Sequence, residues 1–187
     1  MKIVEDVTYQ NFIDQKIEST KEIDFRHCKF KNAEFSDSEF KNVGFVDCIF
    51  DNCDFANSKL NECSIIRTTF ENCKMIGTDF SESYFNESSF NDCNLIYTNY
   101  TDTKIKKTIF KNNNLEKASF NHVKLDKITL EENNMNSSEW IGTNLKDIDL
   151  SNCKIDGILV NKDFLNGVIV NEIQAISLSK LLGIIIK

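Results

Sequence analysis

The sequence has 187 residues, a size that suits one domain with a buried core. Its net charge of −7 argues against a protein that grips nucleic acid through phosphates, because that mode needs an excess of basic side chains. No apolar run approaches the roughly 20 residues that span a bilayer, and residues 1–14 are too polar for a signal peptide. We therefore expect a cytoplasmic protein that does not contact a membrane.

Residues 1–20 are expected to form a partial coil that caps the N-terminal end of the structure. Phe12 and Ile17 lie five residues apart, as later apolar residues do, but Ile17 and Phe25 lie eight apart. This spacing predicts a three-residue bulge near Ser19–Glu22.

A five-residue repeat runs through residues 21–160. Every residue from Phe25 to Val160 at a multiple of five is apolar or aromatic, and 13 of the 15 phenylalanines occupy this register. The position two residues earlier is mostly small and holds all seven cysteines. The other three positions are mostly Asn, Asp, Glu, Lys and Ser. A repeat this regular determines the fold more than any local signal does.

A period of five fits neither a helix nor a simple strand. Residues two apart point the same way on an extended chain, so each small and large pair would face a common axis. A corner must follow each pair, and Asn and Asp suit such corners. The sequence therefore predicts an all-β solenoid in which four sides close a square coil. Residues 21–160 would make about seven coils without interrupting loops.

Residues 161–187 are expected to cap the other end of the solenoid. Asn171 and Gln174 have the spacing of a capping box, which predicts a helix over residues 172–182 that ends at Gly183. One interpretation is a cap folded on its own solenoid, and the other is a two-fold dimer in which helix and tail pack on a second copy. The candidate dimer residues are Ile173, Ile176, Leu178, Leu181, Leu182, Ile184 and Ile186.

The repeat resembles that of the pentapeptide repeat family over residues 21–160. This resemblance implies a right-handed quadrilateral β-helix. Residues 9–17 (YQNFIDQKI), 139–143 (EWIGT) and 174–184 (QAISLSKLLGI) further resemble the quinolone-resistance (Qnr-type) branch. That branch implies a homodimer that binds DNA gyrase or topoisomerase IV and protects the enzyme from fluoroquinolones. The resemblance to a mycobacterial relative of the branch implies that binding mimics duplex DNA. Many Gram-negative members carry interrupting loops that protection needs, so their absence here favours topoisomerase binding over protection.

Outward residues twenty positions apart should stack on one face of such a coil. The resulting acidic residues are candidates for partner binding: Glu39, Glu62, Asp79, Glu82, Asp102 and Glu139. They would imitate DNA phosphates toward basic topoisomerase residues, or form an ordinary solvated surface. A second acidic group, around Phe30, Phe50 and Phe70, is expected on a neighbouring face.

Two other outward groups are notable. Ile76, Ile96 and Tyr97 are expected either to contact a partner or to pack locally at a corner. A basic patch gathers around Ile105 and Leu125, where it is either solvated or contacts an acidic part of a partner. Its members are Lys104, Lys106, Lys107, Lys124 and Lys127.

No sequence motif indicates catalysis. The sequence has no C-x-x-C pair, phosphate-binding loop or nucleophile elbow, and a filled bore leaves no ordinary pocket. We therefore expect no enzyme activity, metal, cofactor, small-molecule substrate or direct contact with nucleic acid. The cysteines are expected to be small buried thiols. A rigid scaffold that binds an unrelated protein is the alternative function.

Overall fold

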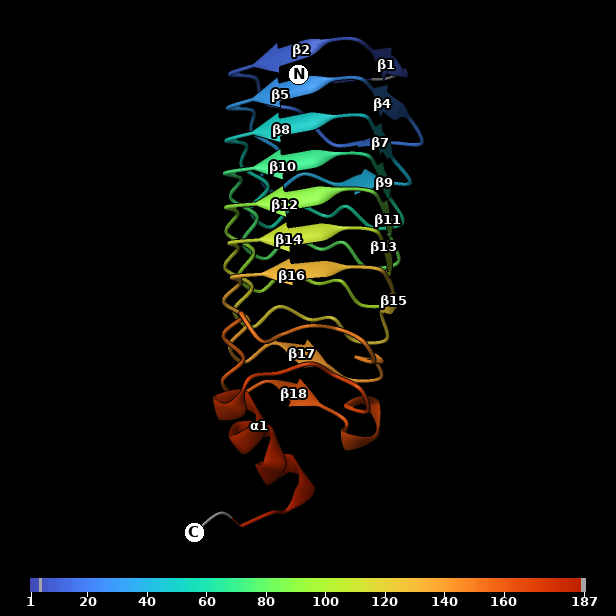
Figure 1. Ribbon diagram of the computed structural model, residues 1–187. Coiled ribbons are helices and arrows are strands. Elements are labelled where there is room, and N and C mark those ends of the chain that lie inside the picture. Colours follow the sequence, from blue (N-terminus) through green and yellow to red (C-terminus); the bar gives the residue numbers. More distant parts are fainter. Residues whose placement is uncertain (4, 186–187) are drawn as a thin grey trace.

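The computed structural model describes residues 1–3 and 5–185. The chain winds into a right-handed parallel β-solenoid of about eight turns, with one short helix at the C-terminal end (Figure 1). This confirms the predicted fold class. Each turn has four sides, which we call faces A, B, C and D in chain order. In the third turn they are centred on Phe45, Phe50, Phe55 and Leu60.

Faces A and B are continuous parallel sheets of seven strands each. Partners are twenty residues apart through most of the shaft, as in Phe70 with Phe90. Face A contains β1 (Val7–Thr8), β4 (Asp24–Arg26), β7 (Gly44–Val46), β9 (Ser64–Ile66), β11 (Tyr84–Asn86), β13 (Lys104–Lys106) and β15 (Lys124–Asp126). Face B contains β2 (Asn11–Ile13), β5 (Lys29–Lys31), β8 (Ile49–Asp51), β10 (Thr69–Glu71), β12 (Ser89–Asn91), β14 (Ile109–Lys111) and β16 (Thr129–Glu131).

Faces C and D are held mostly by single bridges between turns. Face C runs from Lys16 to Lys154, and face D continues through Glu39 to Glu139. Face D also has four short strands, β3 (Thr20–Lys21), β6 (Phe40–Lys41), β17 (Glu139–Trp140) and β18 (Leu159–Val160). Three helical segments follow, η1 (Lys162–Phe164), α1 (Glu172–Ser179) and η2 (Lys180–Leu182).

Aromatic rings fill the bore of the solenoid. On face B, Phe50, Phe70 and Phe90 stack with ring centroids 4.8 and 4.7 Å apart. Rings on adjacent faces meet edge to face, as Phe50 does with Phe55 at 5.2 Å. Stacked and edge-to-face pairs are both favourable arrangements, so the five-residue register produces one continuous aromatic column.

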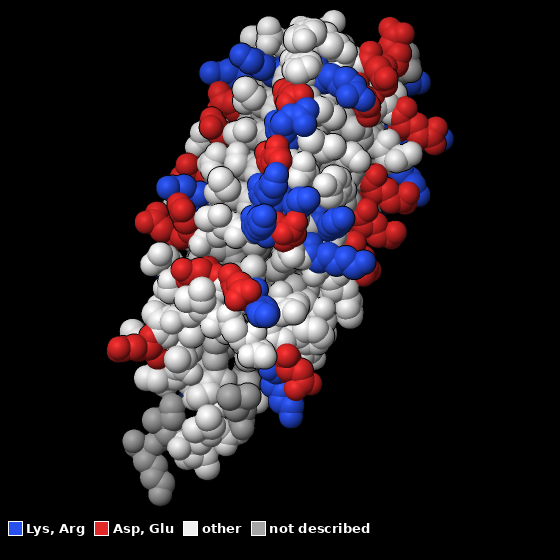
Figure 2. Space-filling model, turned by 45° about the vertical axis from the view of Figure 1, so that its right-hand side comes forward, with Lys and Arg blue, Asp and Glu red and all other residues white. Residues whose placement is uncertain are grey.

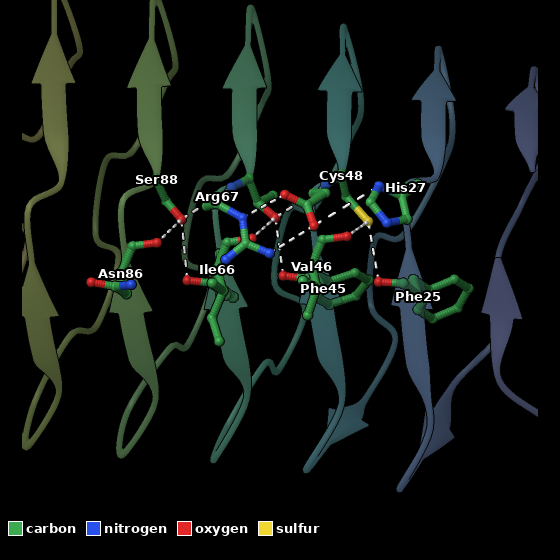
Figure 3. Close-up of polar contacts among 12 residues, drawn as sticks. Phe25, His27, Phe45, Val46, Cys48, Ile66, Arg67, Asn86 and Ser88 are labelled. Atoms are coloured by element: carbon green, nitrogen blue, oxygen red, sulfur yellow. Dashed lines mark hydrogen bonds and ion pairs between the residues drawn. The ribbon is translucent and has the colours of Figure 1, made fainter. Parts of the chain in front are cut away.

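The small residues that precede each large central residue by two positions form hydrogen-bonded ladders inside the corners. Between faces A and B, the side chains of Cys48, Thr68 and Ser88 each donate to the carbonyl of the central residue in the preceding turn (Figure 3). The Thr68 hydroxyl lies 3.0 Å from the Phe45 carbonyl. A small side chain at this position fits beside the rings, and a hydroxyl or thiol there satisfies a buried carbonyl.

The residue two positions after the central residue of each side adopts a left-handed backbone conformation, which turns the chain into the next side. Twenty-six described non-glycine residues have φ between +46° and +62°, including Asn52, Glu62 and Lys107. Asn and Asp tolerate this conformation best, which explains their frequency in the sequence.

The first turn corrects the predicted N-terminal bulge. Phe12 pairs with Phe30, eighteen residues on, whereas Thr20 pairs with Phe40, twenty residues on. The fourth side of this turn is therefore two residues shorter than usual, and the chain contains no inserted bulge. Ile3, which is buried, lies beside this short side, and the Thr20 hydroxyl donates to its carbonyl at 3.0 Å.

The helix α1 closes the C-terminal end. Asn171 and Gln174 form the expected capping box, and the Gln174 side chain also donates to the carbonyls of Leu150 and Cys153 at 2.8 and 2.7 Å. Gly183 adopts the left-handed conformation after η2, with φ of 73°. The helix is therefore tied by hydrogen bonds to the last turns of its own solenoid.

Tyr100 is expected to be a weak point of the core. Its ring stacks between Phe80 and Phe120, but its buried hydroxyl has no hydrogen-bond partner among the described residues, and burial raises its pKa well above the usual value. Tyr100→Phe removes this group and keeps the ring, so the free energy of unfolding should rise by about 1–2 kcal/mol. Urea denaturation measures the change, and Tyr84→Phe at a half-buried outward position is the control. A loss of stability in Tyr100→Phe would contradict this interpretation.

Candidate partner-binding surfaces

The six acidic candidates lie in two rows on and beside face D. Glu39, Asp79 and Glu139 belong to one row, but Lys59, Asn99 and Ser119 occupy the intervening turns. Glu62, Glu82 and Asp102 occupy three successive turns at the corner between faces D and A, and all three adopt the left-handed corner conformation. Only this second group, which we call the acidic corner, places carboxylates on consecutive turns.

The acidic corner is exposed to solvent. Its first member is paired, because the Lys41 ammonium lies 2.9 Å from the Glu62 carboxylate. This hydrogen bond raises the pKa of Lys41, and the negative field of Glu82 adds to the effect. The corner therefore holds a net negative charge and already stabilises one cationic side chain.

Asp79 and Glu139 are less available to a partner. Both are half-buried. Asp79 accepts hydrogen bonds from the side-chain amides of Asn61 and Asn99 at 2.8 and 2.9 Å, and Glu139 accepts one from Asn121 at 3.0 Å. These two carboxylates tie neighbouring turns together.

The second acidic group was wrongly expected on a neighbouring face. It surrounds Phe30, Phe50 and Phe70 on face B, which is opposite face D in the four-sided turn. Part of its charge is neutralised by ion pairs, since Lys31 lies 3.4 Å from Asp51 and Lys111 lies 3.0 Å from Glu131. The two acidic groups therefore cannot form one continuous surface.

The apolar candidates on face C are only partly accessible. Ile76 and Ile96 are half-buried on successive turns. Tyr97 is 56% exposed, but the Lys117 ammonium lies 5.2 Å from its ring centre and donates to its hydroxyl at 3.1 Å. This arrangement favours local packing at the corner.

The C-terminal candidates divide into two groups. Leu178 is buried against its own solenoid, so it belongs to the cap. The expectation that its side chain lies in a dimer interface is therefore corrected. Ile173 and Ile176 are 77% and 52% exposed on the other side of α1, and Leu181 and Ile184 are exposed as well. The side chain of Leu182, and Ile186 as a whole, lie outside the described residues. Gln174 was not predicted to contact the solenoid.

The basic patch lies on face A, where Lys104 pairs in register with Lys124. Lys107 lies 2.9 Å from Glu87, and Lys106 lies 3.7 Å from Asp126. Figure 2 turns this side of the shaft forward and shows basic side chains gathered along it.

The cysteines are buried single thiols. Burial raises the pKa of Cys63 to about 12, which keeps it protonated and unreactive at neutral pH. Within residues 1–3 and 5–185, no group of three metal-ligating side chains lies together. No described helix has the length and apolar character needed to cross a membrane.

Comparison with known families agrees with this architecture. Residues 43–120 and 83–159 match the profile described as "Pentapeptide repeat region", and residues 21–55 match "Pentapeptide repeats (8 copies)". The chain belongs to the pentapeptide repeat family. A search of curated proteins found no significant match.

Solved structures share the repeat at low sequence identity. A trypsin-treated form of QnrB1, a plasmid-mediated fluoroquinolone resistance protein, is 17% identical over 97% of this chain and 99% of its own, with a TM-score of 0.36. A thylakoid-lumen pentapeptide repeat protein of Arabidopsis thaliana is 21% identical over 50% of this chain and 65% of its own, with a TM-score of 0.48. HetL of Nostoc, involved in heterocyst differentiation, is 11% identical over 83% and 85%, with a TM-score of 0.29. Pentapeptide repeats thus occur in proteins with different roles.

Proposed function

We propose that this pentapeptide repeat protein binds DNA gyrase or topoisomerase IV as an acidic rod that imitates DNA, modulates the enzyme and lowers its sensitivity to fluoroquinolones. The observation that carries the proposal is the acidic corner, in which Glu62, Glu82 and Asp102 occupy three successive turns. The segments that resemble the Qnr-type branch support the choice of partner. The function is binding and not catalysis.

The spacing of charge supports a limited form of mimicry. Successive turns of a β-solenoid rise by about 4.8 Å, whereas successive phosphates of one DNA strand rise by about 3.4 Å along the helix axis. Three carboxylates therefore imitate only a short stretch of one strand. A basic surface that binds DNA would pair with them, as Lys41 already does with Glu62 at 2.9 Å.

Reversing the acidic corner should abolish the effect on the topoisomerase. The triple variant Glu62→Lys, Glu82→Lys, Asp102→Lys turns an attractive surface into a repulsive one, so the concentration for half-maximal effect should rise about tenfold or more. Gyrase supercoiling with and without ciprofloxacin is the measurement. The matched control is Glu71→Lys, Asp92→Lys, Glu132→Lys, which has the same change in net charge at the diagonally opposite corner.

The assay separates the alternatives. Rescue of supercoiling in drug supports protection, and inhibition without rescue supports mimicry alone. Equal effects of wild type and both triple variants would exclude a role for the acidic corner. No effect of the wild-type protein on gyrase or topoisomerase IV would leave a rigid scaffold for another protein as the function.

We also propose that the protein is a homodimer joined through its C-terminal ends. Ile173 and Ile176 are exposed beside Leu181 and Ile184, which is an unusual amount of apolar surface for one short helix and tail. The variant Ile173→Asp, Ile176→Asp should sediment as a monomer while the wild type sediments as a dimer. Ile13→Asp, at a residue 55% exposed near the other end, is the control and should remain dimeric. A monomeric wild-type protein would refute this proposal.

A further inference from the structure

The solenoid is split open on the adjacent faces A and B between its last two turns, and face A carries the larger opening. In each earlier turn, backbone N–H groups on face A donate hydrogen bonds to carbonyls of the next turn. Lys107 N–H, for example, donates to the Asp126 carbonyl at 2.8 Å. The equivalent bonds from Leu125 to Asn144 and from Lys127 to Lys146 are absent from the described residues. The sheet of face A therefore ends at β15, whose lower edge keeps unpaired backbone groups.

Faces C and D remain closed at the same level. On face C, Met135 N–H donates to the Lys154 carbonyl at 2.8 Å. On face D, β17 pairs with β18, and Leu159 N–H donates to the Ser138 carbonyl at 2.9 Å. The last turn is thus held on faces C and D and open on faces A and B, since β16, like β15, has no strand partner in the last turn among the described residues.

Two isoleucines lie at the corner between the two open faces. The corner ladder that contains Cys48, Thr68 and Ser88 continues through Thr108 and then reaches Ile128 and Ile148. Both are larger than the small residues that fit there, and neither can donate to a carbonyl in the preceding turn. The two turns separate where these isoleucines stack, which was not predicted from the sequence.

The opening is a cleft along the lower edge of β15. It has two adjoining parts of about 610 and 350 Å³ that share Leu125, Asn144 and Lys146 as walls. Leu125 and Ile128 are only half-buried, although central residues above them, such as Ile105, are fully buried. The cleft therefore combines an apolar floor with a free strand edge.

Cationic side chains surround this edge. Lys124, Lys127 and Lys146 line the cleft, and Lys104 stacks directly above Lys124. None of these four lysines has a carboxylate within ion-pair distance among the described residues. The carboxylates of Asp102, Asp126 and Asp147 also line the cleft. Asp126 is paired with Lys106.

We propose that the free edge of β15 is a docking site for an extended acidic segment of a partner protein, which adds a strand to the sheet of face A. The segment would accept hydrogen bonds from the N–H groups of Leu125 and Lys127. Its own N–H groups would donate to the carbonyls of Val123 and Leu125, which accept none from the next turn among the described residues. Because side chains alternate along a strand, apolar residues would cover Leu125 and Ile128 while carboxylates would meet Lys124 and Lys104. This cleft adjoins the acidic corner, because Asp102 belongs to both, but the docking proposal does not depend on the proposed function.

A labelled synthetic peptide tests the site directly. The probe is a fluorescein-labelled heptapeptide of alternating valine and glutamate, and fluorescence anisotropy measures its binding to the full chain. The same peptide with N-methylated backbone amides cannot form the ladder and should bind about tenfold or more weakly, because several hydrogen bonds are lost. A valine and lysine peptide should not bind. Equal binding of the methylated and unmethylated peptides would overturn strand addition and leave only charge attraction.

Variants of the protein test the cleft. Lys124→Glu, Lys127→Glu should weaken binding about tenfold or more, whereas Lys21→Glu, Lys29→Glu, with the same charge change near the other end, should alter it less than about twofold. Ile128→Thr, Ile148→Ser restores small residues to the ladder and closes the cleft. This variant keeps every lysine, so it should lose binding only if the opening itself is needed.

Hydrogen exchange provides a readout that needs no binding assay. The amides of Leu125 and Lys127 should exchange much faster than those of Ile105 and Lys107 in the free protein, because the latter are bonded to the next turn. The valine and glutamate peptide should slow exchange at Leu125 and Lys127. Slow exchange at these two amides in the free protein would mean that the edge is already covered and would overturn the proposal.

Discussion

Replacing Phe70 with alanine is expected to lower the free energy of unfolding by about 3–5 kcal/mol, the usual cost of removing a fully buried aromatic ring. Phe70 is fully buried between the rings of Phe50 and Phe90, at 4.8 and 4.7 Å. The bore is closed on all four sides at this level, so the neighbouring turns cannot collapse into the cavity without breaking their ladders. Urea denaturation followed by circular dichroism measures the effect.

The control for this variant is Ile109→Ala on the outside of the same face. Ile109 is 43% exposed, so its truncation should cost less than about 1 kcal/mol. The two variants remove side chains from opposite sides of one sheet. Similar losses of stability in both would contradict an aromatic column as the main source of stability.

Replacing Gln174 with alanine is expected to cost about 2–4 kcal/mol, because several buried polar groups lose their partners at once. The carbonyls of Leu150 and Cys153 would lose the side-chain amide, and the backbone N–H of Asn171 would lose its acceptor in the capping box. The helix α1 should then detach from the last turns. Hydrogen exchange should accelerate in α1 and in the turn above it, and chemical denaturation measures the loss of stability.

Ser177→Ala is the matched control in the same helix. Ser177 is exposed, and alanine favours helix, so stability should change by less than about 0.5 kcal/mol. An equally small effect of Gln174→Ala would show that the cap does not depend on the buried amide.

Most of the shaft could be predicted because one rule repeats. A large residue at every fifth position and a small one two residues earlier leave a single way to bury both, so Phe45 and Thr68 follow directly from their places in the register. The short first turn could not be predicted. The interval between Ile17 and Phe25 fits either three added residues or two missing ones, and only the pairing of Thr20 with Phe40 decides between them.

The candidate surfaces were predicted less completely, because stacking was foreseeable and hydrogen bonding was not. Glu62 and Glu82 follow from a twenty-residue spacing, but the capture of Asp79 by Asn61 and Asn99 depends on side-chain geometry. The inward orientation of Leu178 depends on how α1 packs on the solenoid. The opening at Ile128 had a signal in the sequence, since a large residue interrupts a column of small ones.

The twenty-residue register also determines which insertions and deletions evolution can accept in this shaft. Gain or loss of five residues between Glu62 and Glu82 would rotate every later residue by one face and would move Glu82 and Asp102 away from Glu62. Gain or loss of twenty residues would change only the length and preserve every face. The eighteen-residue pairing of Phe12 with Phe30 shows that a terminal turn escapes this constraint, because a missing pair of residues there shortens one side without shifting the turns that follow. Homologous shafts should therefore differ in length by whole turns, with irregular lengths confined to their ends.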